Sequence, residues 1–299
     1  MAGQEVSSVS SGYTLSLFKT LRSEWIKLVT LRSTWWLTLV AVLANVGICL
    51  IMSASLRLAA INRSADAGSP SNGPEGEVGP GELGMLSEYI TQGCNSIGPL
   101  IFIILAILVI TNEYSSGMIR STFTVGPRRS RVLIAKLVVI AIMGVLIFGI
   151  SLAIGWSGGY LILQDTTGFD LTLTSATSLR ILSGFVAEMV LLAWLCFGLG
   201  AWIRSTAGSI GAAIGVIWIL PMIFMLVTSI YTASGNQTGW RKWLIDSQQF
   251  LPTNAGGRVT ELSMPDSALF GPWEGLGILG GWALLALVIG FIATVRRDA

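Results

Sequence analysis

The chain has 299 residues, of which 11% are charged and 53% are hydrophobic, and it contains no histidine. An ordinary soluble domain carries about 25% charged residues, so this composition excludes a soluble globular enzyme and predicts a protein that lies largely in lipid. Three scattered cysteines, Cys49, Cys94 and Cys196, predict neither a zinc cluster nor a disulfide framework. We therefore expect no metal site on this chain.

The N-terminal segment, residues 1–34, is polar and basic, with an amphipathic stretch at 14–32. At 100° per residue its leucines and aromatic residues share one face, opposite Lys19, Ser23 and Lys27. This pattern predicts an interfacial helix on the cytoplasmic leaflet. Two interpretations remain open, a plain membrane anchor and an elbow that transmits motion.

Residues 35–299 are expected to form one membrane domain of six transmembrane helices, since a helical span needs about 20 apolar residues. The six apolar runs are 35–56, 89–111, 132–154 (with an extension to 163), 181–203, 207–230 and 273–295. The second run is the weakest, and Pro99 is expected to bend it. The fold class is predicted to be all-α.

The distribution of charge predicts the orientation of these spans. If the N-terminus is inside, twelve of the 18 lysines and arginines fall on the inner side, and five acidic residues fall in the first outer loop. Both termini are therefore expected in the cytoplasm, with the chain in a bacterial cell membrane. The inner loop at 204–206 is predicted to be too short to hold any site.

Two outer loops are expected, at 57–88 and 231–272. The first contains a tract rich in Ser, Gly, Pro and Glu, and the second is more apolar. Trp240, Trp243 and Phe250 in the second loop predict short helices at the outer interface, although the tryptophans could equally be simple interface anchors.

Signatures of catalysis are not found. The sequence has no G-x-x-x-x-G-K-[ST] phosphate loop, no H-E-x-x-H and no G-x-S-x-G motif. The chain is therefore expected to be neither an enzyme nor a nucleic-acid-binding protein. One ionisable residue, Glu188, falls well within a predicted span. An intramembrane carboxylate is by default a functional candidate, for a substrate path or for proton handling, but it can also serve packing.

Three pairs of glycines have the spacing that allows close helix contact in lipid: Gly155 with Gly159, Gly211 with Gly215, and Gly277 with Gly281. Each pair could pack within the bundle or across a dimer.

The most informative segment is the inner loop 112–131, between the second and third predicted spans. Glu113 ends the helix, Gly117 follows four residues later, and Arg120, Arg128 and Arg131 flank a short apolar stretch. Positive charge on the inner side explains the arginines, but it does not explain the glutamate or the glycine.

This segment resembles the permeases of ABC-2 type transporters. The resemblance rests on Glu-x-x-x-Gly-Met-Ile-Arg at 113–120, on Pro127 and Arg131, on Lys136 in the next span, on the leader at 23–28 and on Phe-Leu-Pro-Thr-Asn at 250–254. Met118 stands where the family usually has Thr. The layout is closest to the bacitracin- and sodium-export type.

The resemblance implies a complex of two permease chains, either two copies of this one or this one with a homologue, and two separate ATPase subunits. ATP and magnesium would be bound by the ATPase, and no cofactor is expected on this chain. It also implies that 112–131 forms a coupling helix that docks on the ATPase. The residues of that contact would be Glu113, Gly117, Met118, Ile119, Arg120, Arg128 and Arg131.

Two other functions remain open. A secondary transporter would use a proton gradient through Glu188, and a membrane sensor or scaffold would not transport at all. An ABC permease, in contrast, needs a partner with a phosphate loop.

Overall fold

The computed structural model describes residues 17–66, 85–115, 129–165, 173–233, 239–263 and 267–297. All regular elements in these ranges are helices, and five crossings are long and apolar enough for a membrane. Two further helices, bent by 48° to each other, are together long and apolar enough to be a sixth crossing. The prediction of an all-α membrane protein is confirmed.

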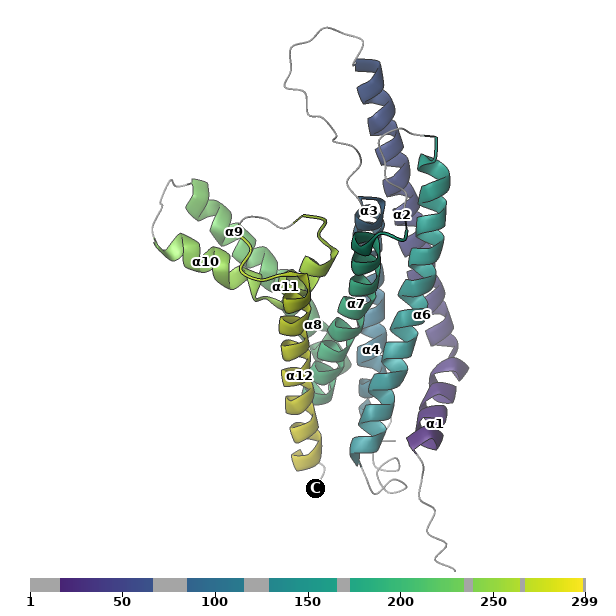
Figure 1. Cartoon of the computed structure of the whole chain (residues 1–299). Helices are drawn as coiled ribbons and strands as arrows, with labels where there is room; N and C mark the ends of the chain where they lie inside the picture. Colours follow the sequence, from purple (N-terminus) through teal and green to yellow (C-terminus); the bar gives the residue numbers. More distant parts are fainter. Residues whose placement is uncertain are drawn as a thin grey trace, which may run out of the picture.

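The helices follow the predicted order. The N-terminal helix α1 (Leu17–Thr30) is followed by α2 (Arg32–Asp66), the bent pair α3 (Met85–Cys94) and α4 (Gly98–Ser115), α6 (Arg129–Leu163) and α7 (Ala176–Ile203). The next span combines α8 (Thr206–Ile214), a π-helical turn η1 (Gly215–Ile219) and α9 (Leu220–Ala233). Last come α10 (Gly239–Gln249), α11 (Pro252–Gly257), the 3₁₀ turn η2 (Arg258–Thr260) and α12 (Pro272–Arg297). Figure 1 shows α1 and the C-terminal end of α12 at the same end of the bundle.

The helix α2 is longer than its predicted span, and α6 ends at 163, where the predicted extension of the third span ends. Both α2 and α6 have 35 residues, which corresponds to about 52 Å at 1.5 Å per residue and exceeds a hydrocarbon core of about 30 Å. The end of α2 extends through 57–66, inside the predicted outer loop 57–88, because this stretch is rich in the strong helix formers Leu, Ala and Arg. Likewise, α4 and α6 extend into both ends of the predicted inner loop 112–131.

The bend in the second crossing lies at 95–97, between α3 and α4. Pro99 occupies the first turn of α4, where the missing proline N–H leaves no hydrogen bond unmade. The expected bend is thus present, but Pro99 starts a new helix after the break and does not kink the middle of one.

The π-helical turn precedes a proline and is supported by a contact from α11. Pro221 lacks an N–H and crowds the carbonyl four residues earlier, that of Ile217. The hydroxyl of Thr253, in α11, donates a hydrogen bond of 3.1 Å to that carbonyl. The short helix α11 therefore supplies the hydrogen bond that the proline removes from the span.

The core is built from the buried faces of α4, α6, α7 and α12. At the α7–α12 crossing, a Cβ added to Gly198 would lie 2.5 Å from the backbone carbon of Ala286, and one added to Gly290 would lie 2.7 Å from the Gly198 carbonyl oxygen. These two glycines let the helix backbones touch.

The glycine pairs predicted from spacing divide into two groups. Gly155 and Gly159 pack within the chain, since a Cβ on the first would meet Cys49 and one on the second would meet Ser53. Gly211, Gly215, Gly277 and Gly281 have no atom of the described chain within 4 Å of an added Cβ. The second group therefore lies on open helix surface.

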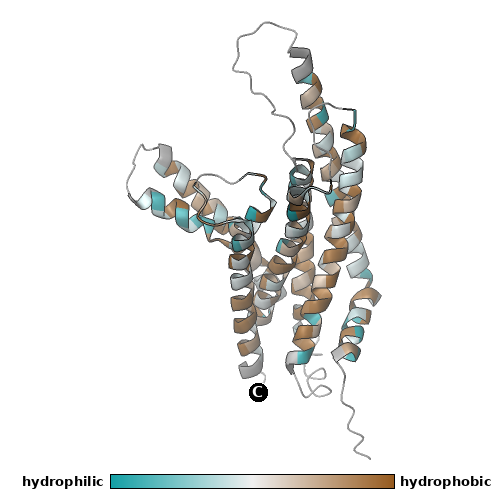
Figure 2. Cartoon of the chain, in the orientation of Figure 1, coloured by the Kyte–Doolittle hydropathy of each residue, from teal (hydrophilic) through white to brown (hydrophobic). Residues whose placement is uncertain are grey.

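The outside of the bundle is apolar along the long helices, whereas hydrophilic residues gather on α1 and α10 (Figure 2). Met222, Met225 and Leu226 on α9, and Leu43 and Ile51 on α2, are each more than half exposed. The two predicted outer-interface tryptophans, Trp240 and Trp243, are exposed on α10, so the expected short helices before the last span are present.

Candidate functional site

Four charged side chains from three helices form a closed cluster, which we call the charge ring: Glu24 and Lys27 of α1, Glu113 of α4 and Lys136 of α6. The Lys136 Nζ lies 2.6 Å from one Glu24 oxygen and 2.7 Å from a Glu113 oxygen. The Lys27 Nζ lies 2.6 Å from the other Glu24 oxygen and 3.5 Å from Glu113. Positive and negative groups alternate, so the ring is electrically neutral when all four are ionised.

The ring is mostly shielded from solvent. The side chain of Lys136 is 3% exposed, that of Glu24 6% and that of Glu113 10%, whereas that of Lys27 is 42% exposed. Burial alone would raise the pKa of Glu24, but the charge of Lys136 and hydrogen bonds from both lysines outweigh it, so the pKa is lowered from its usual value of 4.5. Burial would lower the pKa of Lys27, but its bonds to Glu24 and Glu113 raise it. Both groups stay charged at neutral pH.

The position of the ring follows from the chain order. Glu113 lies in the last turn of α4 and Lys136 in the first turns of α6, so the ring joins the two helices that residues 116–128 connect. Glu24 pairs with the same lysine and so ties α1 to these two helices. Glu113, which positive-inside charge did not explain, is therefore the partner of a lysine buried at the start of a membrane helix.

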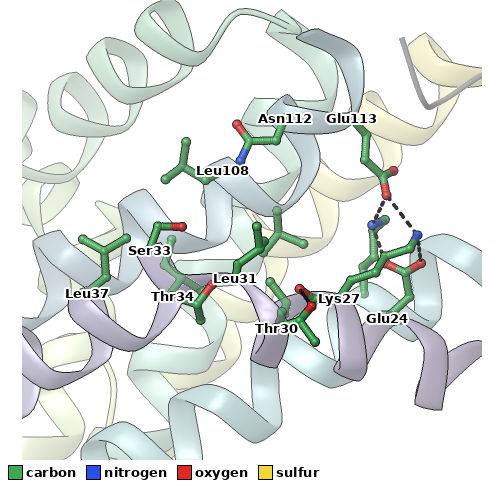
Figure 3. A pocket seen from close by; sticks show the side chains of 14 residues that line it. Glu24, Lys27, Thr30, Leu31, Ser33, Thr34, Leu37, Leu108, Asn112 and Glu113 are labelled. Carbon is green, nitrogen blue, oxygen red and sulfur yellow. Dashed lines mark hydrogen bonds and ion pairs between the residues drawn. The ribbon is translucent and has the colours of Figure 1, made fainter. Parts of the chain in front are cut away.

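A cavity of about 400 Å³ lies between α1, the start of α2 and the end of α4 (Figure 3). The charge ring forms one end of it, as the dashed contacts of Glu24, Lys27 and Glu113 in Figure 3 show. Its apolar wall is made by Leu28, Leu31, Leu37, Leu105, Leu108 and Val109. The elbow and the first span thus leave room beside the end of α4.

The residue after Glu113 makes a second set of contacts. The Tyr114 hydroxyl lies 3.0 Å from the Thr294 hydroxyl of α12, and the Arg204 guanidinium lies 4.9 Å from the centre of the Tyr114 ring. Arg204 also donates a hydrogen bond of 3.0 Å to the Ala293 carbonyl. The end of α4 is therefore held by α1 and α6 on one side and by α12 and the α7–α8 turn on the other.

The inner loop 204–206, expected to be too short to hold a site, makes a packing contact inside the chain. Arg204 ends α7 with φ of 61°, the left-handed conformation, and its N–H bonds to the Gly200 carbonyl. Ser205 then caps α8 by accepting a hydrogen bond from the Gly208 N–H. This tight turn directs the Arg204 side chain toward Tyr114.

Two substitutions of Arg204 separate the stability that its side-chain contacts contribute from the strain of its left-handed backbone. Arg204→Ala should lower the free energy of unfolding by about 1.5–3 kcal/mol, because a charged hydrogen bond and the ring contact are lost. Arg204→Gly should lose about 1 kcal/mol less, since glycine adopts positive φ without strain. Denaturant unfolding in detergent measures both, with exposed Arg22→Ala as the control. Equal losses for the two variants would contradict this account.

Glu188 lies elsewhere in the bundle. It is 2% exposed on α7, under α11, where a Cβ on Gly256 would lie 3.2 Å from its Oε1. Its Oε2 has no hydrogen-bond partner within the described residues. Glu188 takes no part in the charge ring: it lies under α11, which Figure 1 shows beside the start of α12 and away from α1.

Most of the predicted coupling residues, Gly117, Met118, Ile119, Arg120 and Arg128, lie outside the described residues. Glu113 and Arg131 are described, and they lie near the ends of α4 and α6 that flank this segment. The structure therefore locates the two ends of the predicted loop.

Sequence reasoning missed the roles of Glu24, Lys27, Tyr114 and Arg204. One signal was available for Glu24. Lys136 lies inside an apolar run, and a lysine buried there requires an acidic partner from another segment. Within the residues that the structure describes, no group of three His, Cys, Asp or Glu side chains could hold a metal ion.

A comparison of the sequence with family models places these features in a known group. The model described as ABC-2 family transporter protein matches residues 20–218, which include most of α1, the charge ring, Glu188 and Arg204. No curated protein matches the chain at a significant level. Since the match covers about two thirds of the chain, this multi-pass membrane protein belongs to the ABC-2 transporter family as a permease component.

Proposed function

We propose that the chain is the permease of a bacterial ABC exporter, and that residues 116–128 dock on a separate ATPase that binds ATP and magnesium. The observation that supports this most is the charge ring, which ties both helices flanking that segment to the elbow helix α1. A displacement of the segment is then transmitted to α1, α4 and α6 together. The elbow acts as a transmitting element as well as an anchor.

The chemistry of the segment suits a protein groove. Met118 and Ile119 can enter an apolar groove, while Arg120 and the arginines at 128 and 131 meet acidic groups at its rim. Gly117 permits a tight turn or a close backbone approach. ATP binding would close the paired ATPases and move this segment, and the bundle would alternate between inward-open and outward-open states.

The complex would contain two permease chains and two ATPases, with both permease termini in the cytoplasm of a bacterial cell. The open glycines Gly211 and Gly215 and the exposed methionines of α9 provide a surface that a second permease chain can cover. The remaining apolar surface would face lipid.

A proton-coupled carrier is the alternative that one observation favours, because Glu188 is a buried carboxylate whose Oε2 lacks a hydrogen-bond partner in the described chain. The two mechanisms differ in their energy source. Glu188→Gln should abolish a proton-coupled activity and leave most of an ATP-driven one. A membrane sensor or scaffold would need no ATPase at all.

The docking assignment is tested by co-purification of the tagged permease with the ATPase encoded beside it. Arg120→Glu should reduce the bound ATPase at least about tenfold, since a close like-charge contact costs more than 1.4 kcal/mol. Gly117→Leu should have a similar effect. The matched control is Arg57→Glu, at the far end of α2, which should retain the ATPase. Wild-type amounts of ATPase on the Arg120 and Gly117 variants would overturn the assignment.

A further inference from the structure

Two cysteines that are 45 residues apart in sequence meet between α2 and α3. The Cys49 Sγ lies 3.3 Å from the Cys94 Sγ, and both residues are fully buried. The Cys49 thiol also lies 3.3 Å from the Ile90 carbonyl oxygen of α3. The cysteine spacing predicted no such pairing, because only the packing of the bent crossing against α2 brings the two together.

The packing around the thiols holds them in place. A Cβ on Gly93 would lie 3.1 Å from both the Cα and the Sγ of Cys49, and a Cβ on Gly155 would lie 3.2 Å from that Sγ. These glycines bring the backbones of α3 and α6 against Cys49. Backbone packing therefore brings the two cysteines next to each other.

The pair lies far from the charge ring. Cys49 is about 26 Å along α2 from Arg32, at 1.5 Å per residue. Cys94 is the last residue of α3, and the next two residues, Asn95 and Ser96, are polar and exposed. Cys49 lies inside the predicted span 35–56, so in the orientation proposed above the pair is buried in the outer half of the membrane, on the side of the extracytoplasmic compartment where disulfides form and persist.

We propose that Cys49 and Cys94 are a reversible redox modification site, at which oxidation forms a disulfide that links α2 to α3. With a small apolar disulfide compound as oxidant, one thiolate attacks it and releases the first thiol. The second cysteine then attacks the mixed disulfide and releases the second thiol. One S–S bond forms in the protein, one is reduced in the oxidant, and the two protons are taken up by the released thiolates.

The link would constrain the bent crossing. Its outer part, α3, would be fixed to α2, while its inner part, α4, carries Glu113 of the charge ring in its last turn. Movement of α4 would then be restricted at its start, through α3 and α2, and near its end, by α1 and α6. Oxidation should therefore slow any ATP-driven rearrangement of the bundle, and a reductant should restore it. Only this last consequence rests on the proposed function.

The test uses the purified full-length chain in lipid nanodiscs, treated with the membrane-permeant aromatic disulfide 4,4′-dithiodipyridine. After denaturation, free thiols are labelled with a maleimide and counted by intact mass. The reduced chain should take up a label on each of its three cysteines. The oxidised chain should lose two labels without gaining the mass of the oxidant, and peptide mapping should join the peptides of Cys49 and Cys94.

Variants supply the controls. Cys196, equally buried on α7, is the third cysteine and should carry the one label that the oxidised wild type keeps. The oxidised Cys196→Ser chain should therefore take up no label. In Cys49→Ser or Cys94→Ser, the remaining cysteine of the pair has no thiol to attack, so no internal disulfide should form. Unchanged labelling of the oxidised wild type, stable adducts of the oxidant, or disulfides between chains would each overturn the proposal. None of these readouts depends on transport or on the ATPase, so the proposal and the proposed function fail separately.

Discussion

Lys136→Met should lower the free energy of unfolding by about 3–5 kcal/mol, which is the usual cost of removing one partner from a buried ion pair. The Lys136 side chain is 3% exposed and contacts both Glu24 and Glu113. Its removal leaves two shielded carboxylates facing each other, with only Lys27 to balance them. Denaturant unfolding of the chain in detergent measures the loss.

Two controls separate this electrostatic cause from a packing effect. Lys27→Met removes the same charge from a side chain that is 42% exposed, and it should cost at most about 1 kcal/mol. Adding Glu24→Gln and Glu113→Gln to Lys136→Met should restore most of the lost stability, because no unpaired buried charge then remains. If the triple variant lost as much free energy of unfolding as Lys136→Met alone, the ring would not stabilise the chain through charge.

Gly198→Leu should be the most damaging change at the α7–α12 crossing, with a loss of about 3 kcal/mol, at the upper end of the usual range for overpacking. An added Cβ at Gly198 would lie 2.5–2.7 Å from backbone atoms of Ala286 and Leu287, which cannot move aside as a side chain can. The two helices would have to separate.

The matched control for this variant lies on α12 itself. Gly277→Leu adds the same side chain where no atom lies within 4 Å of an added Cβ, so it should leave the free energy of unfolding nearly unchanged. Unfolding of both variants under the same conditions gives the comparison. Similar losses at the two positions would mean that the α7–α12 contact is not as tight as described.

The spans could be predicted from sequence because each is a long apolar run, and the bilayer fixes the length that such a run needs. Helix ends were harder to predict, since α2 continues as a helix beyond its apolar part. Apolar character ends at the membrane surface, whereas helix propensity does not. The π-helical turn at Gly215–Ile219 was also missed, because it depends on Pro221 together with a hydroxyl from α11.

Of the four residues of the charge ring, only Glu113 belongs to the predicted coupling site. The inner loop was identified by its own motif, but Glu24 precedes Glu113 by a whole membrane span, and nothing in the sequence pairs them. Arg204 was set aside because its loop is short, yet a short turn at the end of a span can direct a long side chain across the bundle. Such contacts depend on tertiary packing, so sequence periodicity could not predict them.

The central claim is that ATP binding by a partner ATPase moves this bundle through the segment after α4. The most direct test is a distance measurement between spin labels at Leu58 on α2 and Ile230 on α9, both exposed. Only one permease chain of the reconstituted complex would carry the labels. Trapping the ATPase with ATP and vanadate should shift the distance distribution, and the shift should be absent with Arg120→Glu. Identical distributions with and without nucleotide, in a complex that still binds its ATPase, would contradict the account.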